Sequence, residues 1–558
     1  MPAPPLHVTA GPAPRPHPGV SLGRYVLDAL KEHVALSIPA QVDSETGREM
    51  SFPELLRQSV AAAEGWRRLG LTSGDTLAVF SAHNHFLYPA FFGAVFEGTK
   101  IAIIKHSTPE ELRHFLSLCR PKAILTEPAN LATTMAAQPD NLPLVVSAAQ
   151  VPTDLHMAVG TRALSVPELV ALGGAATPAT YRPGYDGDPK AHDAFLLFSS
   201  GSSGLPKLVR LSDFSFTMTM LFMGTWMLRP GDRMFITSQL SWATGLTFTF
   251  TSTVLGVTRV YGWFGQDYGE KDWMDIVQKN KVSAWFVPPV GLTLLATEAR
   301  ARRSRGEPVP LSSLRVLIST GSGLHADAQR YFSEVLGTPV VQWYGITEAG
   351  IITADALPAR PGSTGRLTPG IRLRLVDVDS GLDVEEPNTI GEVRVTSPAY
   401  MSGYSGADNP DETSASLDEH GFFCTGDLAY RDADGYLFLV DRIKDQIKFD
   451  NMPLAPAEVE AVLLSHPGVK EACVTGRPDQ LRLVDLATAF VVRQPGAAEV
   501  SEAELQAQQA QARLSYEKWL YGGVFFREQI PMTANGKADR RQLRDWLKAL
   551  PPPQNDRK

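Results

Sequence analysis

Short apolar runs and helical segments alternate between residues 76 and 126, and this alternation limits the possible folds more than any other feature of the sequence. Runs rich in β-branched and other apolar residues are typical of buried strands. These runs are Thr76–Ser81, Lys100–Ile104 and Ala123–Thr126. Between the last two runs, Thr108 is placed to cap a helix and Glu111 follows it by three residues, as in a capping box. Strands that alternate with helices at this spacing predict a parallel, doubly wound sheet.

The same alternation recurs farther along the chain and then stops. Strand signals return at residues 233–237, 282–287 and 315–319, whereas after about residue 365 the strands become shorter and turns more frequent. Beyond residue 441 an α+β pattern follows, with a helix that begins near Pro456. We therefore expect an α/β fold with a large N-terminal domain of doubly wound sheets, a β subdomain and a small α+β C-terminal domain. The expected bounds are 1–21 for a flexible lead-in, 22–440 for the N-terminal domain with its β subdomain at about 365–440, 441–548 for the C-terminal domain and 549–558 for a tail.

Charge and cysteine content exclude several classes of protein. Lys and Arg number 52 against 60 Asp and Glu, a net charge of −8, so no basic excess points to a nucleic acid or an anionic membrane as partner. Cys119, Cys424 and Cys473 are the only cysteines and cannot build a four-thiolate zinc site. No run of about 18 apolar residues predicts a transmembrane span. Because the N-terminus is not a secretory signal and the C-terminus is not Ser-Lys-Leu, we expect a cytoplasmic rather than a peroxisomal protein.

A loop of small residues predicts a phosphate-binding site. It reads Ser199-Ser200-Gly201-Ser202-Ser203-Gly204-Leu205-Pro206-Lys207 and follows an apolar strand at Ala194–Phe198. Small residues let backbone N–H groups approach an anion, hydroxyl groups add donors, and Lys207 adds a positive charge. The loop is not a Walker A motif, because no Gly-Lys-Ser/Thr follows its glycines. Taken alone, the same residues also fit a flexible Ser/Gly linker.

Four further motifs follow in order along the chain. Tyr344-Gly345-Ile346-Thr347-Glu348 combines an aromatic ring, a tight turn, a hydroxyl and a carboxylate, which suit a nucleotide with its metal ion. Thr425-Gly426-Asp427 ends an apolar strand and places a carboxylate where it can hold a ribose diol. Asp441–Asp445 lies at the expected domain junction, and Pro531–Lys537 presents Lys537 at the tip of a turn. Each motif alone is more often structural, whereas all five in this order favour a functional interpretation.

The five motifs together resemble those of the adenylate-forming (ANL) superfamily over roughly residues 22–548. The resemblance is closest to the branch of acyl-CoA synthetases, 4-coumarate–CoA ligases and firefly luciferases. It is carried by VDRIKDQIKF at 440–449, LAPAEVEAVLLSHPGV at 454–469 and GGVFF at 522–526. The resemblance implies that ATP and Mg²⁺ convert a small-molecule carboxylic acid to an acyl-adenylate with release of pyrophosphate, and that CoA then accepts the acyl group. It also implies a small C-terminal domain that is mobile, with Lys444 as its hinge.

The resemblance also implies roles for individual residues. The phosphates of ATP would be held by Ser199, Ser200, Gly201, Ser202, Ser203, Gly204 and Lys207. The ATP- or AMP-binding set would further include Thr320, Gly321, Ser322, Gln342, Tyr344 and Gly345, with Tyr344 stacked on the adenine. Thr347 would contact the α-phosphate, and Glu348 would hold Mg²⁺. Asp427 would bind the ribose hydroxyls with help from Arg442, and Lys537 would bridge the substrate carboxylate and the α-phosphate.

The acid and the acyl acceptor have their own expected residues, and here the sequence departs from the family pattern. The acid pocket is expected at Trp242, Gly245, Val287, Gly321 and Ile351, where few charges fall, so an apolar fatty or aryl acid is favoured. Trp242 stands where luciferases and many relatives carry histidine. The CoA channel is expected at Lys448 and Asn451. Relatives carry Lys-Gly or Ser-Gly at 450–451, whereas this chain has Asp450-Asn451, which adds a negative charge and a side chain.

This departure leaves two alternatives open. The enzyme would form the adenylate without using CoA, either oxygenating it as luciferases do or passing it to another acceptor. Alternatively, the chain is a catalytically weak relative that binds a ligand. Intact Lys207, Glu348 and Lys537 argue against the second alternative.

Overall fold

The chain folds into two compact units that are each built from separate sequence segments. The structure is a computed structural model that describes residues 7–550 apart from 106, 138–141, 152–162, 200–206, 225–226, 263–269, 322–323, 325, 406–410, 444–446, 450–451, 455, 480–483, 498–499, 512–518 and 534–537. The larger unit contains Thr9–Leu373 and Val395–Phe423. The smaller unit contains Met1–Val8, Arg374–Arg394 and Cys424–Lys558.

The first sheet of the larger unit confirms the parallel arrangement expected from residues 76–126. Its eight strands have the order β20-β10-β9-β5-β4-β6-β7-β8. They are Gly403–Ser405 (β20), Lys207–Ser212 (β10), Asp193–Ser199 (β9), Lys100–Ile103 (β5), Thr76–Phe80 (β4), Ala123–Thr126 (β6), Leu144–Val146 (β7) and Ala163–Ser165 (β8). The strands from β9 to β8 run parallel, whereas β10 and β20 are antiparallel additions at one edge.

The second sheet of the larger unit has nine strands, in the order β17-β16-β15-β14-β13-β11-β12-β2-β3. They are Arg366–Leu367 (β17), Gly350–Ala354 (β16), Val340–Ile346 (β15), Val316–Ser319 (β14), Ala284–Phe286 (β13), Arg233–Ile236 (β11), Thr258–Tyr261 (β12), Pro39–Asp43 (β2) and Glu49–Ser51 (β3). The strands from β15 to β2 are parallel. Two parallel sheets with helical connections confirm the predicted α/β class.

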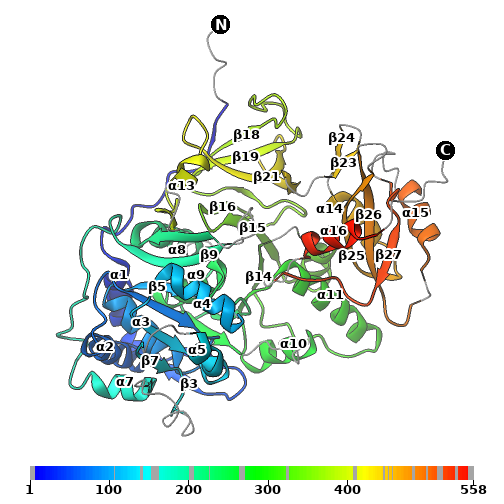
Figure 1. Ribbon diagram of the computed structural model, residues 1–558. Helices are drawn as coiled ribbons and strands as arrows, with labels where there is room; N and C mark the ends of the chain where they lie inside the picture. Colours follow the sequence, from blue (N-terminus) through cyan, green and yellow to red (C-terminus); the bar gives the residue numbers. More distant parts are fainter. Residues whose placement is uncertain are drawn as a thin grey trace. The chain divides into compact units, whose positions relative to one another are not determined.

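Helices connect these strands and cover the sheets (Figure 1). They are Leu22–Glu32 (α1), Phe52–Arg68 (α2), Leu87–Phe96 (α3), Pro109–Cys119 (α4), Leu131–Ala137 (α5), Val166–Leu172 (α7), Asp213–Gly224 (α8), Ala243–Val254 (α9), Glu270–Lys279 (α10), Pro289–Ser304 (α11) and Ala326–Arg330 (α12). The predicted capping box at the start of α4 is present, because Thr108 and Glu111 each accept a hydrogen bond from the other's backbone N–H. Local sequence signals therefore fix where this helix begins.

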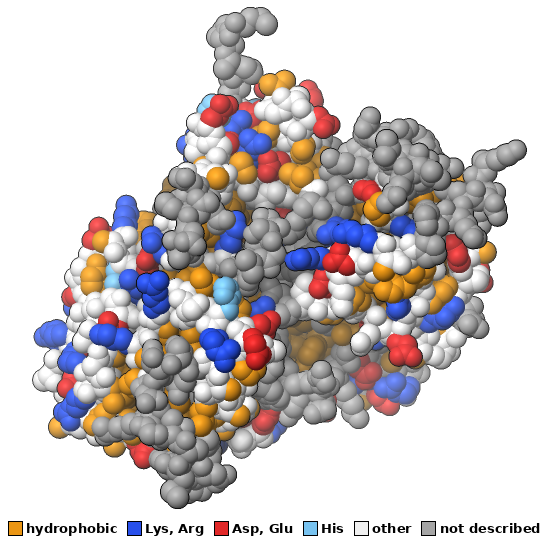
Figure 2. Space-filling model, in the orientation of Figure 1, with side chains coloured by type: hydrophobic (Ala, Val, Ile, Leu, Met, Phe, Trp, Pro, Cys, Tyr) orange, Lys and Arg blue, Asp and Glu red, His pale blue; other side chains and the backbone are white. Residues whose placement is uncertain are grey.

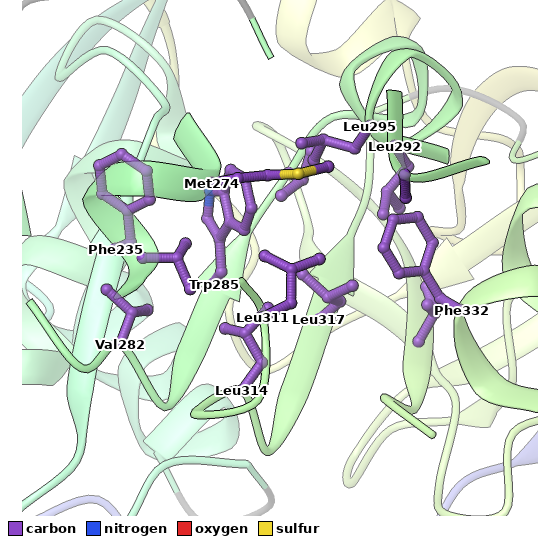
Figure 3. Close-up of a cluster of buried hydrophobic side chains, with 14 of the residues drawn as sticks. Phe235, Met274, Val282, Trp285, Leu292, Leu295, Leu311, Leu314, Leu317 and Phe332 are labelled. Carbon is purple, nitrogen blue, oxygen red and sulfur yellow. The ribbon is translucent and has the colours of Figure 1, made fainter. Parts of the chain in front are cut away.

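A buried apolar cluster packs helices against the nine-stranded sheet (Figure 3). Phe235, Trp285 and Leu317 come from three neighbouring parallel strands, and Met274 and Phe332 pack against them from the helical layer. All five side chains are fully buried. Burial of a large apolar side chain stabilises a fold by about 1.5–3 kcal/mol, so this cluster holds the strands whose carboxyl ends carry candidate site residues.

The smaller unit combines a β layer with an α+β part. The β layer contains β18 (Arg372–Val376), β19 (Gly391–Thr396), β21 (Phe423–Arg431) and β22 (Leu437–Arg442), which are neighbours in that order. The α+β part has the hairpin β23 (Ile447–Phe449) and β24 (Met452–Leu454), and a three-stranded sheet of β25 (Val469–Asp479), β26 (Val484–Arg493) and β27 (Val524–Arg527). Its helices are α14 (Pro456–Leu464), α15 (Glu502–Gln511) and α16 (Arg540–Lys548). The predicted helix near Pro456 is confirmed.

Charges of both signs share the described surface. On the face drawn in Figure 2, Lys and Arg side chains lie among Asp and Glu side chains. Within the part of the chain that the structure describes, no helix has both the length and the apolar character that a bilayer crossing needs.

The carboxyl group of Asp355 makes stability depend on pH. Asp355 follows β16 and is fully buried. Burial raises its pKa to about 7, although the backbone N–H of Arg360 donates to it, with distances of 3.3 and 3.2 Å to the two oxygens. The folded chain therefore keeps this proton between about pH 4 and pH 7, whereas the unfolded chain loses it. Because the folded state binds more protons in this window, its stability falls as the pH rises through it.

We expect Asp355→Asn to become more stabilising as the pH rises. The amide keeps the size of the carboxyl group but has no charge to desolvate, so the difference in Tm between variant and wild type should be more positive at pH 8 than at pH 5. Asp377→Asn is the control, because bonds from Ser380 lower the pKa of Asp377 and its charge does not change between these pH values. Thermal unfolding of both variants at the two pH values checks this. Equal pH trends for the two would contradict the assignment to Asp355.

Candidate active site

Many of the predicted site residues lie at one edge of the nine-stranded sheet. In a parallel sheet the carboxyl ends of all strands meet at the same edge, where ligands bind in open α/β folds. Val287 directly follows β13, Thr320 and Gly321 directly follow β14, and Thr347 and Glu348 directly follow β15. Trp242 follows β11 by six residues and precedes α9. The structure thus brings predicted nucleotide residues and predicted acid-pocket residues to one edge, whereas Ser322 lies outside the described residues.

The Tyr344–Glu348 motif forms the end of β15 and a tight turn into β16. The two strands are antiparallel, with an irregularity between Tyr344 and Gly345. A Cβ atom on Gly345 would lie 2.5 Å from the carbonyl oxygen of Gly350, so only glycine fits at this point near the end of β15. Gln342 and Tyr344 are buried on β15, whereas Thr347 and Glu348 are partly exposed at the turn. The turn therefore offers a hydroxyl and a carboxylate to a ligand.

The strand that leads into the predicted phosphate loop is confirmed. β9 ends at Ser199 and β10 begins at Lys207, and these two residues are paired across the antiparallel ladder. The loop therefore begins and ends at adjacent strand ends. Its residues Ser200, Gly201, Ser202, Ser203 and Gly204 lie outside the described residues. The ammonium group of Lys207 lies 5.0 Å from the ring centroid of Tyr404, a residue that the sequence analysis did not single out.

Gly245, a residue predicted for the acid pocket, lies near the start of α9 and close to the backbone of residues 238–239. A Cβ atom on Gly245 would lie 2.2 Å from the carbonyl oxygen of Gln239 and 2.6 Å from that of Ser238. The helix therefore approaches Ser238 and Gln239 as closely as glycine permits. His83 supports the same segment, because its Nε2 donates to the carbonyl oxygen of Ser238 at 2.8 Å. Burial lowers the pKa of His83 to about 4, so the ring is neutral at neutral pH.

Two buried side chains that the sequence analysis missed, those of Tyr88 and Arg259, extend the contacts of His83. The hydroxyl of Tyr88 donates to Nδ1 of His83 at 2.5 Å, and the guanidinium of Arg259 lies 4.2 Å from the centroid of the Tyr88 ring. Arg259 also donates to Gln41 at 2.9 Å. Tyr88 is five residues from His83, whereas the contacts of Arg259 with Tyr88 and Gln41 join distant parts of the sequence, so no local motif marks Arg259.

Ile351, another predicted pocket residue, lines a small cavity. The cavity has a volume of about 50 Å³ and is also lined by Met218, Thr219, Phe222 and Ala399. The other residues predicted for the acid pocket do not line this cavity: Trp242, Gly245, Val287 and Gly321. Val287 is fully buried, and Trp242 and Ile351 are partly buried.

In the smaller unit, Asp427 and Arg442 form a cross-strand pair. They are directly opposite each other on the antiparallel strands β21 and β22, and Nε of Arg442 lies 2.8 Å from Oδ1 of Asp427. The Asp427 residue is 6% exposed, whereas the Arg442 side chain is 41% exposed. The two side chains that the resemblance assigns to the ribose therefore lie in contact with each other, and their role at the ribose stays a prediction.

The sequence predicted Thr425-Gly426-Asp427 at the end of a strand, whereas it lies within β21, and bonds to the neighbouring strand β19 fix this segment. The hydroxyl of Thr425 donates to the carbonyl oxygen of Val393 at 2.7 Å and accepts from the N–H of Asp427 at 3.0 Å. The N–H of Gly426 donates to Glu392 at 3.3 Å, and Gly426 has a φ of 68°, which glycine adopts without strain. The Thr-Gly-Asp order thus sets the direction of a carboxylate.

The side chains of four other predicted residues lie outside the part of the chain that the structure describes. Lys444, Asn451 and Lys537 lie outside the described residues. Lys448 lies in β23, where its backbone pairs with Pro453 of β24, and its side chain lies outside the described part. Their roles stay predictions.

An α/β unit that gathers candidate residues at the carboxyl edge of a parallel sheet has the arrangement of nucleotide-binding enzymes. The sequence matches the AMP-binding enzyme family over residues 29–405 and the AMP-binding enzyme C-terminal domain over residues 458–537. The first match covers more than half of the chain, which therefore belongs to the AMP-binding enzyme family, within the adenylate-forming superfamily.

Individual relatives agree with this family. The chain is 28% identical over 560 residues to 4-coumarate–CoA ligase 1 of Oryza sativa subsp. japonica, with 95% of this chain and 93% of the relative covered. It is 27% identical over 558 residues to luciferin 4-monooxygenase of Photinus pyralis, with 97% of each chain covered. The solved anthranilate CoA ligase AuaEII, in complex with anthranoyl-AMP, has a TM-score of 0.79 and 24% identity, and the match covers 94% of this chain and 97% of that one. The predicted family and fold are confirmed, and the chain is an adenylate-forming enzyme.

The residues of the larger unit fit the Mg²⁺ and ATP that this family implies. Mg²⁺ in nucleotide sites takes one or two protein carboxylates, with phosphates and water as its other ligands. Glu348 supplies one partly exposed carboxylate. Among the described residues, no group of three or more His, Cys, Asp or Glu side chains forms an all-protein metal site. This donor set suits a metal ion that arrives with the nucleotide.

Proposed function

We propose that the enzyme activates an apolar carboxylic acid with ATP and then transfers the acyl group to CoA. The observation that carries the proposal is the gathering of Gly321, Val287, Trp242, Thr347 and Glu348 at one sheet edge in a member of the AMP-binding enzyme family. The relatives named as CoA ligases support the acceptor. Uncharged side chains, fully buried at Val287 and partly buried at Trp242 and Ile351, support an apolar fatty or aryl acid.

The chemistry needs neutralisation of negative charge. A substrate carboxylate oxygen attacks the α-phosphorus of ATP, the bond to the β-phosphate oxygen breaks, and pyrophosphate leaves with that electron pair. When bound, Mg²⁺ offsets charge on the phosphates. Lys207 is proposed to hold the departing phosphates, Thr347 the α-phosphate, and Lys537 both reacting oxygens. Fixed positive charges stabilise a transition state in which negative charge accumulates.

In the second step the acyl group passes from AMP to CoA. The sulfur of CoA attacks the acyl carbon, the bond to the AMP oxygen breaks, AMP leaves, and the thiol proton passes to solvent. Lys448 and Asn451 are proposed to line the path of the thiol, and Lys444 to be the hinge between the two half-reactions.

A panel of carboxylic acids, read out as AMP release with and without CoA, tests the proposed function. We expect aliphatic and aryl acids to release AMP rapidly only when CoA is present. AMP release that is independent of CoA would instead favour an adenylating enzyme with another acceptor. Acid binding without any AMP release would contradict catalysis and favour a binding relative.

The sequence Asp450-Asn451 is the specific observation behind an acceptor other than CoA. If the Asn451 side chain hinders the thiol, Asn451→Gly should speed thioester formation about fivefold, since relief of a steric cost of about 1 kcal/mol has this effect. Acid-dependent ATP–pyrophosphate exchange should not change. Asn388→Gly is a matched control, because Asn388 has a φ of 62° that glycine adopts readily. Equal thioester rates in wild type and Asn451→Gly would refute the hindrance.

A further inference from the structure

A segment that no sequence motif marked joins the two sides of the candidate phosphate site in the larger unit. β20 pairs antiparallel with β10, and Tyr404 lies directly opposite Val209. Side chains alternate along a strand, so Lys207 and Val209 share one face of β10. A residue opposite Val209 projects from that same face. The register therefore places Tyr404 beside Lys207.

Contacts on both sides of Tyr404 agree with this placement. The ammonium group of Lys207 lies over the Tyr404 ring, 5.0 Å from its centroid. The Tyr404 hydroxyl donates to Oε1 of Glu348 at 3.0 Å. The ring face thus contacts a cation and the hydroxyl contacts an anion, so one side chain touches both charged groups assigned to the metal-bound triphosphate.

The backbone around Tyr404 is tied to the same two elements. The N–H of Met401 donates to the carbonyl oxygen of Glu348 at 2.8 Å, and the N–H of Ser402 donates to the carbonyl oxygen of Arg210 at 2.8 Å. The N–H of Tyr404 donates to the hydroxyl of Thr413 at 3.0 Å. Residues 401–404 therefore hold the turn that carries Glu348 against the strand that begins at Lys207.

We propose that Tyr404 is a positioning residue that orients Glu348 and Lys207 for ATP with its Mg²⁺. This inference rests on the proposed function. The two contacts use different atoms, so they have separable consequences: the hydroxyl orients the carboxylate for the metal ion, and the ring orients the ammonium group for the phosphates. Glu348 and Lys207 are each contacted by an uncharged part of Tyr404, the hydroxyl and the ring respectively. A cation–π contact at a partly exposed site is weak. A contact this weak leaves Lys207 able to bind a phosphate oxygen while the ring still orients the ammonium group.

Two substitutions separate the contacts. Tyr404→Phe keeps the ring and removes the hydroxyl, whereas Tyr404→Leu removes both. Equilibrium binding of ATP, followed by calorimetry at a series of Mg²⁺ concentrations and also in EDTA, reports on the two groups without turnover. Tyr185→Phe is the matched control in the same unit, because it removes a hydroxyl that donates to the backbone carbonyl of Asp188 at 2.8 Å.

We expect the Phe variant to need about tenfold more Mg²⁺ for half-maximal ATP binding, since it loses one hydrogen bond to a charged group. Its affinity for ATP in EDTA should equal that of wild type. The Leu variant should share the Mg²⁺ effect and also bind ATP several-fold more weakly in EDTA, because Lys207 loses the ring. Tyr185→Phe should match wild type in both measurements.

Other results would overturn the inference. An unchanged Mg²⁺ dependence in Tyr404→Phe removes the role of the hydroxyl, and equal EDTA affinities for the Phe and Leu variants remove that of the ring. A lower Tm with unchanged binding in both variants shows that Tyr404 is only structural. Failure of the proposed function looks different: wild type would bind ATP with Mg²⁺ but release no AMP with any acid, while the Mg²⁺ comparison between variants would still give its result.

Discussion

Replacement of Lys537 by Ala is expected to lower acid-dependent ATP–pyrophosphate exchange by about 10²–10³-fold, the usual cost of one lost donor to transition-state charge. The substrate carboxylate and the α-phosphate repel each other as they approach. An ammonium group that contacts both oxygens offsets this repulsion most strongly when the new bond is half formed. The loss should therefore appear in kcat and much less in the KM for ATP.

Two controls make the Lys537 test specific. Lys548→Ala removes a different ammonium group of the smaller unit, which pairs with Asp545 at 2.9 Å on an exposed face of α16, and it should leave exchange unchanged. The second control starts from a chemically prepared acyl-adenylate and measures thioester formation with CoA. Because Lys537 is assigned to the first step alone, this rate should persist in Lys537→Ala. Unaltered exchange in that variant would remove the assigned role.

The parts of the fold that depend on local sequence were predictable. Apolar runs at Thr76–Phe80 and Ala123–Thr126 became adjacent parallel strands, and the Thr108 capping box was read correctly from four residues. The tight turn predicted within the Tyr344–Glu348 motif is present, and it begins at Thr347 because β15 continues to Ile346. In each case the physical cause lies within a few residues of its effect.

The contacts that depend on distant residues were not predictable from one sequence. Tyr404 and Glu348 are 56 residues apart, and His83 and Ser238 are 155 apart. Their meeting is set by strand order and register, which no local pattern encodes. The units themselves are discontinuous, since Arg374–Arg394 packs with Cys424–Lys558 while Val395–Phe423 packs with the larger unit. The change to shorter strands near residue 365 can be read from the sequence. It does not show which segments pack together into one unit.

Replacement of Asp427 by Ala is expected to lower kcat/KM for ATP by about 10²-fold or more. A carboxylate that accepts bonds from both ribose hydroxyls makes two hydrogen bonds to a charged group, each worth about 1.5–3 kcal/mol, and every 1.36 kcal/mol is tenfold. The variant should fold, because the Arg442 side chain that loses its partner is 41% exposed and is solvated by water.

The nucleotide itself supplies the decisive comparison for Asp427. Wild type should use 2′,3′-dideoxy-ATP about as poorly as Asp427→Ala uses ATP, since each lacks the same two bonds. Asp427→Ala should then barely distinguish the two nucleotides, whereas Arg442→Met, which keeps the carboxylate, should still prefer ATP. An Asp427→Ala enzyme that retains the full preference for ATP would show that the ribose is bound elsewhere. In that case the short Arg442–Asp427 contact of 2.8 Å would only join β21 to β22.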